Sequence, residues 1–419
     1  MSSRMRVIVA GMTGNALEFY DFTLFGALSV VLSQKFFPTS DPFAAFLSTL
    51  AAFSIGFIAR PLGAVVLGHI GDKLGRKKAL MASLFMMAIP TFLIGVLPTY
   101  ETIGYAAPLI LVLCRLLQGI CAGGEYNGSA IFLIEHSDRG KNFAGSLASV
   151  AGTFGCLTGV AVGALALQPF MPSWAWRVPF IFGLVLGFVG LYFRSKIEES
   201  PEFIAVLKTK KTEKVPLLPI LKDFKKSVLS CFLGAAFAGT LGSAFIAYIP
   251  IYLNRVASLP MHQSLFYNMF GMTLYILSAP VAGHLADRYG AKNLMLTSCL
   301  VICASAMPIF MLLQTGNLPF ILLAQSVLCI FSAGFVAPMN GFMTTLFPTR
   351  LRYSGITLGY GLGMAVFGGL LPFMSTWLIE KFDYIYCPAF YIMTLSMAGL
   401  FAILLNKESF ISQSIMKAA

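Results

Sequence analysis

The amino-acid sequence predicts an all-α membrane protein with about twelve transmembrane helices, arranged as two six-helix pseudo-repeats. Three observations support this class. Hydrophobic residues make up 58% of the 419 residues and charged residues only 11%, whereas roughly a quarter of an average soluble domain is charged. Apolar runs of about 20 residues, the length that crosses a bilayer as a helix, recur along the chain. A polar loop motif occurs once in each half.

The predicted spans are the apolar runs between clusters of charged, proline and glycine residues. They cover residues 10 to 33, 44 to 70, 79 to 98, 105 to 134, 143 to 168, 177 to 194, 228 to 253, 263 to 286, 294 to 314, 318 to 343, 354 to 379 and 385 to 405. One long polar connection separates two groups of six. We therefore expect an N-terminal six-helix bundle (1–194), a cytoplasmic linker loop (195–227) and a C-terminal six-helix bundle (228–419).

The net charge of +12 is spread over short loops instead of forming one basic patch, which argues against a nucleic-acid partner. Most of the 29 lysines and arginines fall on one side of the membrane if the N-terminus is cytoplasmic, and the segment from 194 to 226 carries the largest group. Because positive loops stay in the cytoplasm, both termini and the linker are predicted to be cytoplasmic.

The repeated loop motif reads GHIGDKLGRKKAL from Gly68 and GHLADRYGAKNLM from Gly283. The alignment matches Asp72 to Asp287 and places Ala291 where the first copy has Arg76. Both copies end an even-numbered span at the predicted cytoplasmic face. Repeats of this kind build the two halves that rock about a central site in transporters, so the motif favours a transporter over a channel or a membrane enzyme.

Several motifs resemble those of the major facilitator superfamily. The first loop motif has the residues expected between helices 2 and 3 of that superfamily, and RLLQGICAGGE from Arg115 to Glu125 resembles its proton-coupled members. NALEFYDFTLFG, GFIARPLGAVVLGHIGD and EESPEF narrow the resemblance to the metabolite:proton symporter family, which includes proline/betaine, α-ketoglutarate, citrate and shikimate carriers. The resemblance implies a major facilitator fold in a bacterial inner (plasma) membrane.

Five charged residues lie in the interior of predicted spans, away from their ends, where charge is costly and usually functional. They are Glu18, Asp21, Arg60, Arg115 and Glu125. Two arginines can balance two of the three acids, which leaves one carboxylate able to bind protons reversibly. We hypothesise that Glu18 or Asp21 carries the proton and that Arg115 alternates between this acid and a substrate carboxylate, with Glu125 also in the coupling group. The alternative is that fixed ion pairs clamp the helices together.

The candidate substrate-binding residues combine these arginines with polar and aromatic neighbours. They are Asn15, Tyr20, Arg60, Arg115, Gln118, Tyr248 and Tyr360. The tyrosines offer aromatic faces for a quaternary ammonium group.

The loop motifs are the candidate cytoplasmic gate. Its predicted residues are Asp72, Gly75, Arg76, Lys77, Asp287 and Arg288. Asp72 is placed to accept hydrogen bonds from the N-terminus of a neighbouring helix, where the dipole favours an anion, and we expect Arg76 to pair with an acid across the two halves. The alternative is a charged turn that only sets the topology.

The leading functional hypothesis is a proton-coupled symporter that imports a small polar solute bearing a carboxylate, either a proline/betaine-type zwitterion or an organic acid. A proton-driven antiporter that exports a drug or metabolite, and a membrane sensor without transport activity, stay open. The sequence has no hydrolase triad, phosphate-binding loop or metal-ligand cluster, so we expect no enzyme activity, metal or cofactor. The expected partners are the lipid bilayer, the solute and protons, and the expected functional unit is a monomer.

Overall fold

A computed structural model describes residues 3–37, 48–49, 51–52, 55–137, 140–168, 170–208 and 217–405, and the regular elements within them are all helices. The first half contains α1 (Ser3–Ala27), α2 (Ser29–Phe36), α4 (Arg60–Lys73), α5 (Arg76–Val96), α6 (Tyr100–Ile103), α7 (Ala106–Glu135), α8 (Lys141–Ala166) and α9 (Arg177–Ser195). The linker contains α10 (Pro201–Lys208) and α11 (Leu217–Asp223). The second half contains α12 (Lys225–Ser243), the π-helix η1 (Ala244–Tyr248), α13 (Ile249–Arg255), α14 (Met261–Tyr289), α15 (Ala291–Leu313), α16 (Leu318–Thr345), α17 (Arg352–Gly363), the π-helix η2 (Met364–Gly368), α18 (Leu370–Phe382) and α19 (Cys387–Leu404).

The helices confirm the predicted membrane class. Within the described residues, ten helices are long and apolar enough to cross a bilayer, and α1 with α2, bent by 67° at their junction, makes an eleventh. The remaining predicted span, 44 to 70, lies partly outside the described residues, and the parts that are described there are mostly helical. Charges and glycines at the loops therefore located most helix ends to within a few residues, but α1 begins at Ser3, well before the predicted start at residue 10.

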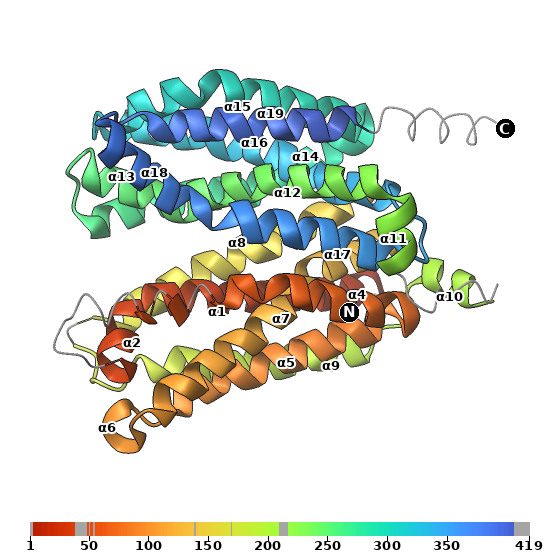
Figure 1. The fold of residues 1–419 in the computed structure, drawn as a ribbon, viewed down its shortest axis with the longest axis horizontal. Helices are drawn as coiled ribbons and strands as arrows, with labels where there is room; N and C mark the ends of the chain where they lie inside the picture. Colours follow the sequence, from red (N-terminus) through yellow and green to blue (C-terminus); the bar gives the residue numbers. More distant parts are fainter. Residues whose placement is uncertain are drawn as a thin grey trace.

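The helices form two layers, one from each half of the chain (Figure 1). In the first half α1 packs on α8 and α9, and α5 packs on α7 and α9. In the second half α15 packs on α16 and α19, and α12 packs on α17 and α19. The boundaries predicted at residues 194 and 228 stay a prediction.

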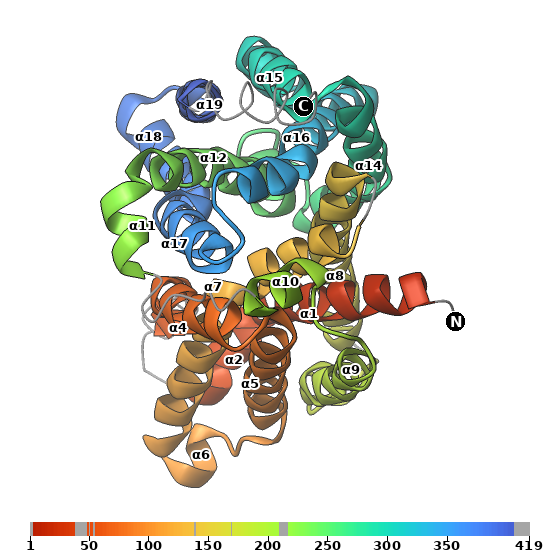
Figure 2. The ribbon, with the colours of Figure 1, turned by 90° about the vertical axis from the view of Figure 1, so that its right-hand side faces the viewer.

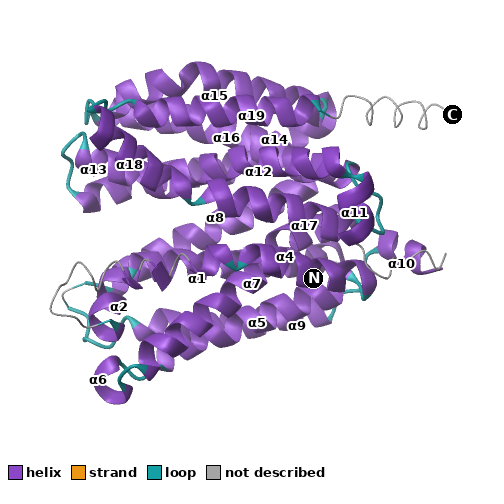
Figure 3. Cartoon of the chain, viewed as in Figure 1, coloured by secondary structure: helices purple, strands orange, loops and turns teal. Residues whose placement is uncertain are grey.

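Two seams join the layers. At one, α8 lies against α14 and α16; at the other, α4 and α7 lie against α17. The short helices α10 and α11 lie at one end of the molecule, here named the linker end, where Figure 2 shows α10 in front of the first half. The loops of the opposite end surround α2, α6 and α13 (Figure 3).

Glycines allow α4 to cross α7 closely. A Cβ atom on Gly63 would overlap the backbone of Ile120, and one on Gly123 would overlap the carbonyl oxygen of Arg60. Small residues let membrane helices approach to backbone contact. Arg60, the first residue of α4, lies at this crossing.

Candidate functional site

Three buried ion pairs occupy the first half, one for each predicted acid. Arg60 pairs with Glu18, Arg115 with Asp21, and Arg194 with Glu125. The sequence interpretation had counted Arg194, the last residue of the predicted span 177 to 194, among the cytoplasmic loop charges, but this residue lies in the last turn of α9 and is fully buried. The expectation of one carboxylate without an arginine is therefore wrong, because the third arginine enters the bundle from the end of a helix.

The Asp21 carboxylate is fully engaged. It accepts hydrogen bonds from Thr91 Oγ1 at 2.9 Å, Gln118 Nε2 at 2.8 Å and Arg115 Nη1 at 2.9 Å. Arg115 also donates to Gln118 Oε1 at 2.9 Å. Since a buried charge is stabilised by such a complete set of partners, this cluster has the character of a fixed clamp between α1, α5 and α7.

The Glu125 carboxylate is engaged in the same way. It accepts hydrogen bonds from Ser83, Ser129 and Arg194. The guanidinium of Arg194 also donates to the backbone oxygens of Ala10 and Leu80. One side chain of α9 thereby joins α1, α5 and α7 beside the linker end.

The Glu18–Arg60 pair differs from the other two. Arg60 Nη2 and Glu18 Oε1 are 3.5 Å apart, and neither oxygen of Glu18 accepts a hydrogen bond from the part of the chain that the structure describes. Arg60 Nε also has no hydrogen-bond partner there. Both residues are buried. This pair therefore has unused hydrogen-bonding capacity in a place without bulk water.

A small cavity lies beside Arg60 at the seam between α4, α7 and α17. Its volume of about 10 Å³ has room for about one water molecule. The lining residues are Phe19, Arg60, Ala122, Gly123, Tyr126 and Asn127 of the first half and Tyr360, Gly361 and Met364 of the second. The rings of Tyr126 and Tyr360 stack at 5.3 Å across the seam, and Phe19 meets Tyr126 edge to face at 6.0 Å. The cavity is thus lined by one cation and three aromatic residues.

Of the predicted substrate-binding residues, Arg60 and Tyr360 line this cavity. The Asn15 side chain donates to the carbonyl oxygen of Ala148, and the Tyr20 hydroxyl donates to that of Pro179 at 2.8 Å. Tyr248 packs against Tyr252 and Phe310 in the second half, while Arg115 and Gln118 belong to the Asp21 cluster. Asn127 lines the cavity without having been predicted, since one asparagine in an apolar helix carries no distinctive pattern.

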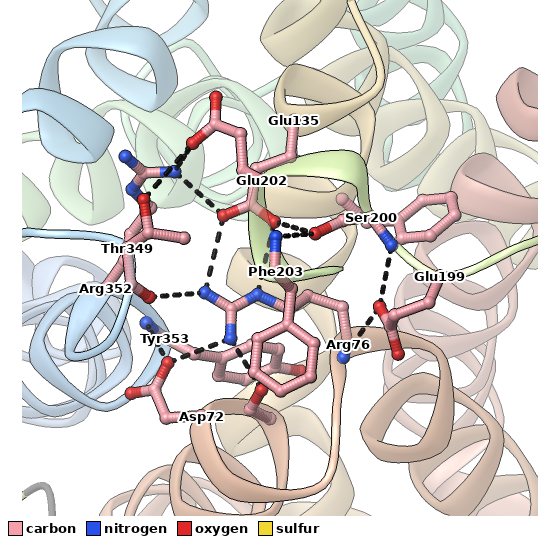
Figure 4. A network of polar contacts seen from close by, with 12 residues as sticks. Asp72, Arg76, Glu135, Glu199, Ser200, Glu202, Phe203, Thr349, Arg352 and Tyr353 are labelled. Atoms are coloured by element: carbon pink, nitrogen blue, oxygen red, sulfur yellow. Dashed lines mark hydrogen bonds and ion pairs between the residues drawn. The ribbon is translucent and has the colours of Figure 1, made fainter. Parts of the chain in front are cut away.

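The first loop motif forms a buried polar network at the linker end (Figure 4). Asp72 accepts hydrogen bonds from the backbone nitrogens of Tyr353 at 3.1 Å and Ser354 at 2.8 Å, both in the first turn of α17. The structure therefore places Asp72 at a helix N-terminus of the other half, as the sequence interpretation expected.

Arg76 pairs with Asp72 at 3.1 Å and with Glu135 at 3.2 Å, two acids of its own half. Its contact across the halves is a 2.7 Å hydrogen bond from Nη2 to the carbonyl oxygen of Thr349. The expectation that Arg76 pairs with an acid across the halves is therefore wrong. The facing segment of the second half offers backbone groups and the cation Arg352, and this cation bonds Glu135 at 2.8 Å.

The linker takes part in this network. Glu199 accepts from the backbone nitrogens of Arg76 at 3.0 Å and Lys77 at 3.2 Å, and Ser200 donates to Glu135 at 2.5 Å. Lys77 Nζ returns a hydrogen bond to the carbonyl oxygen of Ile197 at 2.7 Å. A Cβ on Gly75, whose φ is +114°, would overlap Glu199. The sequence interpretation used EESPEF, which contains Glu199, only as evidence of the family resemblance. It did not predict the contact of Glu199 with the loop motif.

Glu202 bridges the two halves from α10. Its carboxylate pairs with Arg352 of the second half and with Lys141 of the first at 3.1 Å. Partial burial alone would raise the pKa of Glu202, but Arg352 and then Lys141 together hold it below its ordinary value. Glu202 is thus an anion at neutral pH that ties three segments together.

The second loop motif makes a simpler contact. Asp287 accepts from the backbone nitrogens of Asn142 and Phe143, each at 2.9 Å, in the first turn of α8. Arg288 is exposed and its guanidinium lies 5.3 Å from the ring of Tyr289, without an ion pair to any described acid. Both copies therefore cap a helix of the opposite half, and within the described part of the chain the ion pairs belong to the first copy.

Comparison with known proteins agrees with this architecture. The family described as the Major Facilitator Superfamily matches this chain over residues 11–324 and 264–410. The chain belongs to this superfamily. It is 35% identical to a putative proline/betaine transporter of Staphylococcus haemolyticus over 408 residues. The matched region covers 95% of this chain and 86% of the relative. It is 32% identical over 418 residues to the proline/betaine transporter of Escherichia coli K12, with 96% and 83% covered.

Solved structures show the same fold. The proton:xylose symporter XylE bound to 6-bromo-6-deoxy-D-glucose superimposes with a TM-score of 0.77 at 15% identity, covering 96% of this chain and 95% of that one. The superfamily and the relatives together confirm the predicted resemblance. The protein is a multi-pass membrane transporter and not an enzyme.

Proposed function

We propose that the protein is a proton-coupled symporter of a small zwitterion that bears a carboxylate and an ammonium group, of the proline/betaine type, and that it works by alternating access. The observation that carries this proposal is the Glu18–Arg60 pair beside the cavity, with hydrogen-bonding capacity that its neighbours leave unused. The proton gradient supplies the energy, without a cofactor, and a monomer in the lipid bilayer is the functional unit.

Charge balance at Arg60 couples the proton to the solute. An arginine in a protein does not lose its proton, and a buried cation needs an anionic partner. When Glu18 takes up a proton, Arg60 loses that partner, and a substrate carboxylate can replace it. Protonation of Glu18 and binding of the solute therefore favour one another, which is the requirement for symport.

The aromatic side of the cavity suits the other end of such a solute. Tyr126, Tyr360 and Phe19 present three rings near Arg60, and aromatic faces attract quaternary ammonium groups. An organic acid would gain less there because it has no cationic group. These contacts support Glu18 over Asp21 as the proton carrier and Arg60 over Arg115 as the carboxylate ligand, since Asp21 and Arg115 already bind one another at 2.9 Å.

The linker end is proposed to be the cytoplasmic side of a bacterial inner membrane, with both termini on that side. Residues 1–2 and 406–419 lie outside the described residues. The network of Asp72, Gly75, Arg76 and Lys77, together with Asp287 and the neighbouring Arg288, forms the cytoplasmic gate. It ties the halves together at this end, so the solute would enter from the other.

Uptake into proteoliposomes with an imposed pH gradient tests the proposal. Radiolabelled proline and glycine betaine should accumulate when protons flow inward, whereas citrate should not. Glu18→Gln should abolish this accumulation but keep solute exchange, because exchange needs no proton release. Glu101→Gln, at an exposed acid of α6, is the matched control and should transport normally.

Two results would contradict the proposal. Normal gradient-driven accumulation in Glu18→Gln would remove Glu18 from the coupling. Expulsion of the solute under an inward proton gradient would instead support the antiporter.

A further inference from the structure

We propose that Phe22, together with Phe57, is a positioning residue for Arg60. The two rings hold the guanidinium at the cavity during the part of the cycle in which Glu18 is protonated and before the solute has arrived. This inference rests on the proposed roles of Glu18 and Arg60 and assigns a further task to residues that neither the charge pattern nor the cavity lining selects.

The geometry around Arg60 carries the inference. Its guanidinium carbon lies 4.7 Å from the centroid of the Phe22 ring and 4.7 Å from that of the Phe57 ring. The two rings meet edge to face at 5.2 Å and 64°. One cation therefore contacts two aromatic faces, an arrangement whose attraction grows when water is excluded.

Phe22 also contacts the second arginine. The guanidinium carbon of Arg115 lies 4.6 Å from the Phe22 ring and 4.4 Å from the Phe25 ring. Arg115 is held by Asp21 and Gln118 at 2.9 Å each. The Asp21–Arg115 pair therefore orients the Phe22 ring, and this ring in turn orients Arg60.

The transport cycle creates the need for such a support. The ion pair with Glu18 is 3.5 Å long, and Arg60 Nε has no hydrogen-bond partner among the described residues. Once Glu18 is neutral, the two rings are the aromatic contacts that restrain the guanidinium within the part of the chain that the structure describes. A side chain that stays in its binding orientation loses less entropy when the ligand binds, so the rings increase the affinity of the site for the solute carboxylate.

Solute exchange at equilibrium, measured in proteoliposomes without a pH gradient, tests this role. Phe22→Leu should raise the half-saturating concentration of proline or glycine betaine about tenfold and change the maximal rate less than about twofold. Phe57→Leu should act in the same direction, and it keeps the test valid if the Phe22 variant does not fold. Phe57→Tyr should restore the wild-type value, because this half-exposed position keeps its aromatic face.

The matched control is Phe180→Leu, which removes an equally buried ring that packs against Trp176 instead of a guanidinium near the cavity. It should leave the half-saturating concentration within about twofold of the wild type. The second measurement is the half-saturating concentration for exchange in the Glu18→Gln variant, in which Arg60 has lost the carboxylate of Glu18. There the effect of Phe22→Leu should exceed the tenfold seen alone.

The outcomes separate this inference from the proposed function. If Glu18→Gln behaves as proposed but Phe22→Leu and Phe57→Leu match Phe180→Leu, the rings are packing residues and the inference is wrong. If Glu18→Gln transports normally and Arg60→Lys leaves exchange unchanged, the proposed roles of Glu18 and Arg60 are wrong, and the inference about the rings falls with them. An equal effect of Phe22→Leu in both backgrounds also overturns the positioning role.

Discussion

The two copies of the loop motif share a glycine, histidine, aspartate, glycine and lysine at matching positions, yet they make different contacts. Asp72 and Asp287 each accept two backbone hydrogen bonds from the first turn of a helix in the opposite half. Around Asp72, Arg76 and Glu135 are fully buried or nearly so, and the linker covers them. Asp287 and Arg288 are exposed.

The comparison shows that the two copies share a helix-capping aspartate but do not share the ion pairs that Arg76 makes in the first copy. A helix N-terminus is the same chemical partner in either half, because it consists of backbone groups. The ion pairs need particular side chains, and the second copy has Ala291 where the first has Arg76. At the linker end, the seam between α4, α7 and α17 that holds Asp72 should therefore be stronger than the seam of α8 with α14 that holds Asp287. Three experiments test that expectation.

The largest difference is expected between Arg76→Ala and Arg288→Ala. Loss of the buried Arg76 leaves Asp72 and Glu135 without their shared cation, a change that costs about 3–5 kcal/mol. Loss of the exposed Arg288 should cost less than about 0.5 kcal/mol. Thermal unfolding of the purified variants in detergent should show a drop of several degrees for the first alone, and equal drops would mean that the copies are equivalent.

The two aspartates should differ less. Asp72→Asn weakens two buried charge-assisted hydrogen bonds, each worth about 1.5–3 kcal/mol, whereas the exposed Asp287→Asn should lose about 0.3–1 kcal/mol. Spin labels at Lys78 and Lys292, on opposite halves near the linker end, report the opening by their distance distribution. The long-distance population should rise more than tenfold for Asp72→Asn and less than about fivefold for Asp287→Asn. A larger response of Asp287→Asn would reverse the assignment of the stronger seam.

The smallest effect is the pH dependence contributed by Glu202, which pairs with Arg352 at the start of α17 and with Lys141 at the start of α8. Because its pKa is lowered in the bridged state by Arg352 and Lys141, the bridge stabilises the joined halves above the ordinary glutamate pKa of 4.5. That stabilisation is lost as the pH falls through the lowered value. Glu135, Arg76 and Glu199 also belong to this network, so Glu202→Gln must be compared with the wild type.

Spin-label distances in wild type should stay constant from pH 8 to about 5 and lengthen below that range. Glu202→Gln should show the longer distances already at pH 7, with a weaker response to acid. An unchanged acid response in Glu202→Gln would assign the titration to another group of the network.

Much of the architecture was predictable because it depends on local composition. The apolar runs located the helices, and the position of Asp72 at the end of a span predicted its helix cap; the matching cap at Asp287 was not predicted. Glu18, Asp21, Arg60, Arg115 and Glu125 were recognisable because a charge inside an apolar run stands out. Arg194 was not, since it ends a helix where a basic residue is ordinary.

The amino-acid sequence by itself determined the membrane class, the repeat and five of the six side chains that form the buried ion pairs of the first half. Only the tertiary structure decided how these charges pair. The Asp21 carboxylate accepts hydrogen bonds from Arg115, Gln118 and Thr91, whereas that of Glu18 accepts none from the described residues. Residues of the linker also form hydrogen bonds with the gate. The physical reason is that hydrophobicity is a property of each segment, whereas the partners of a buried charge come from helices far apart in the chain.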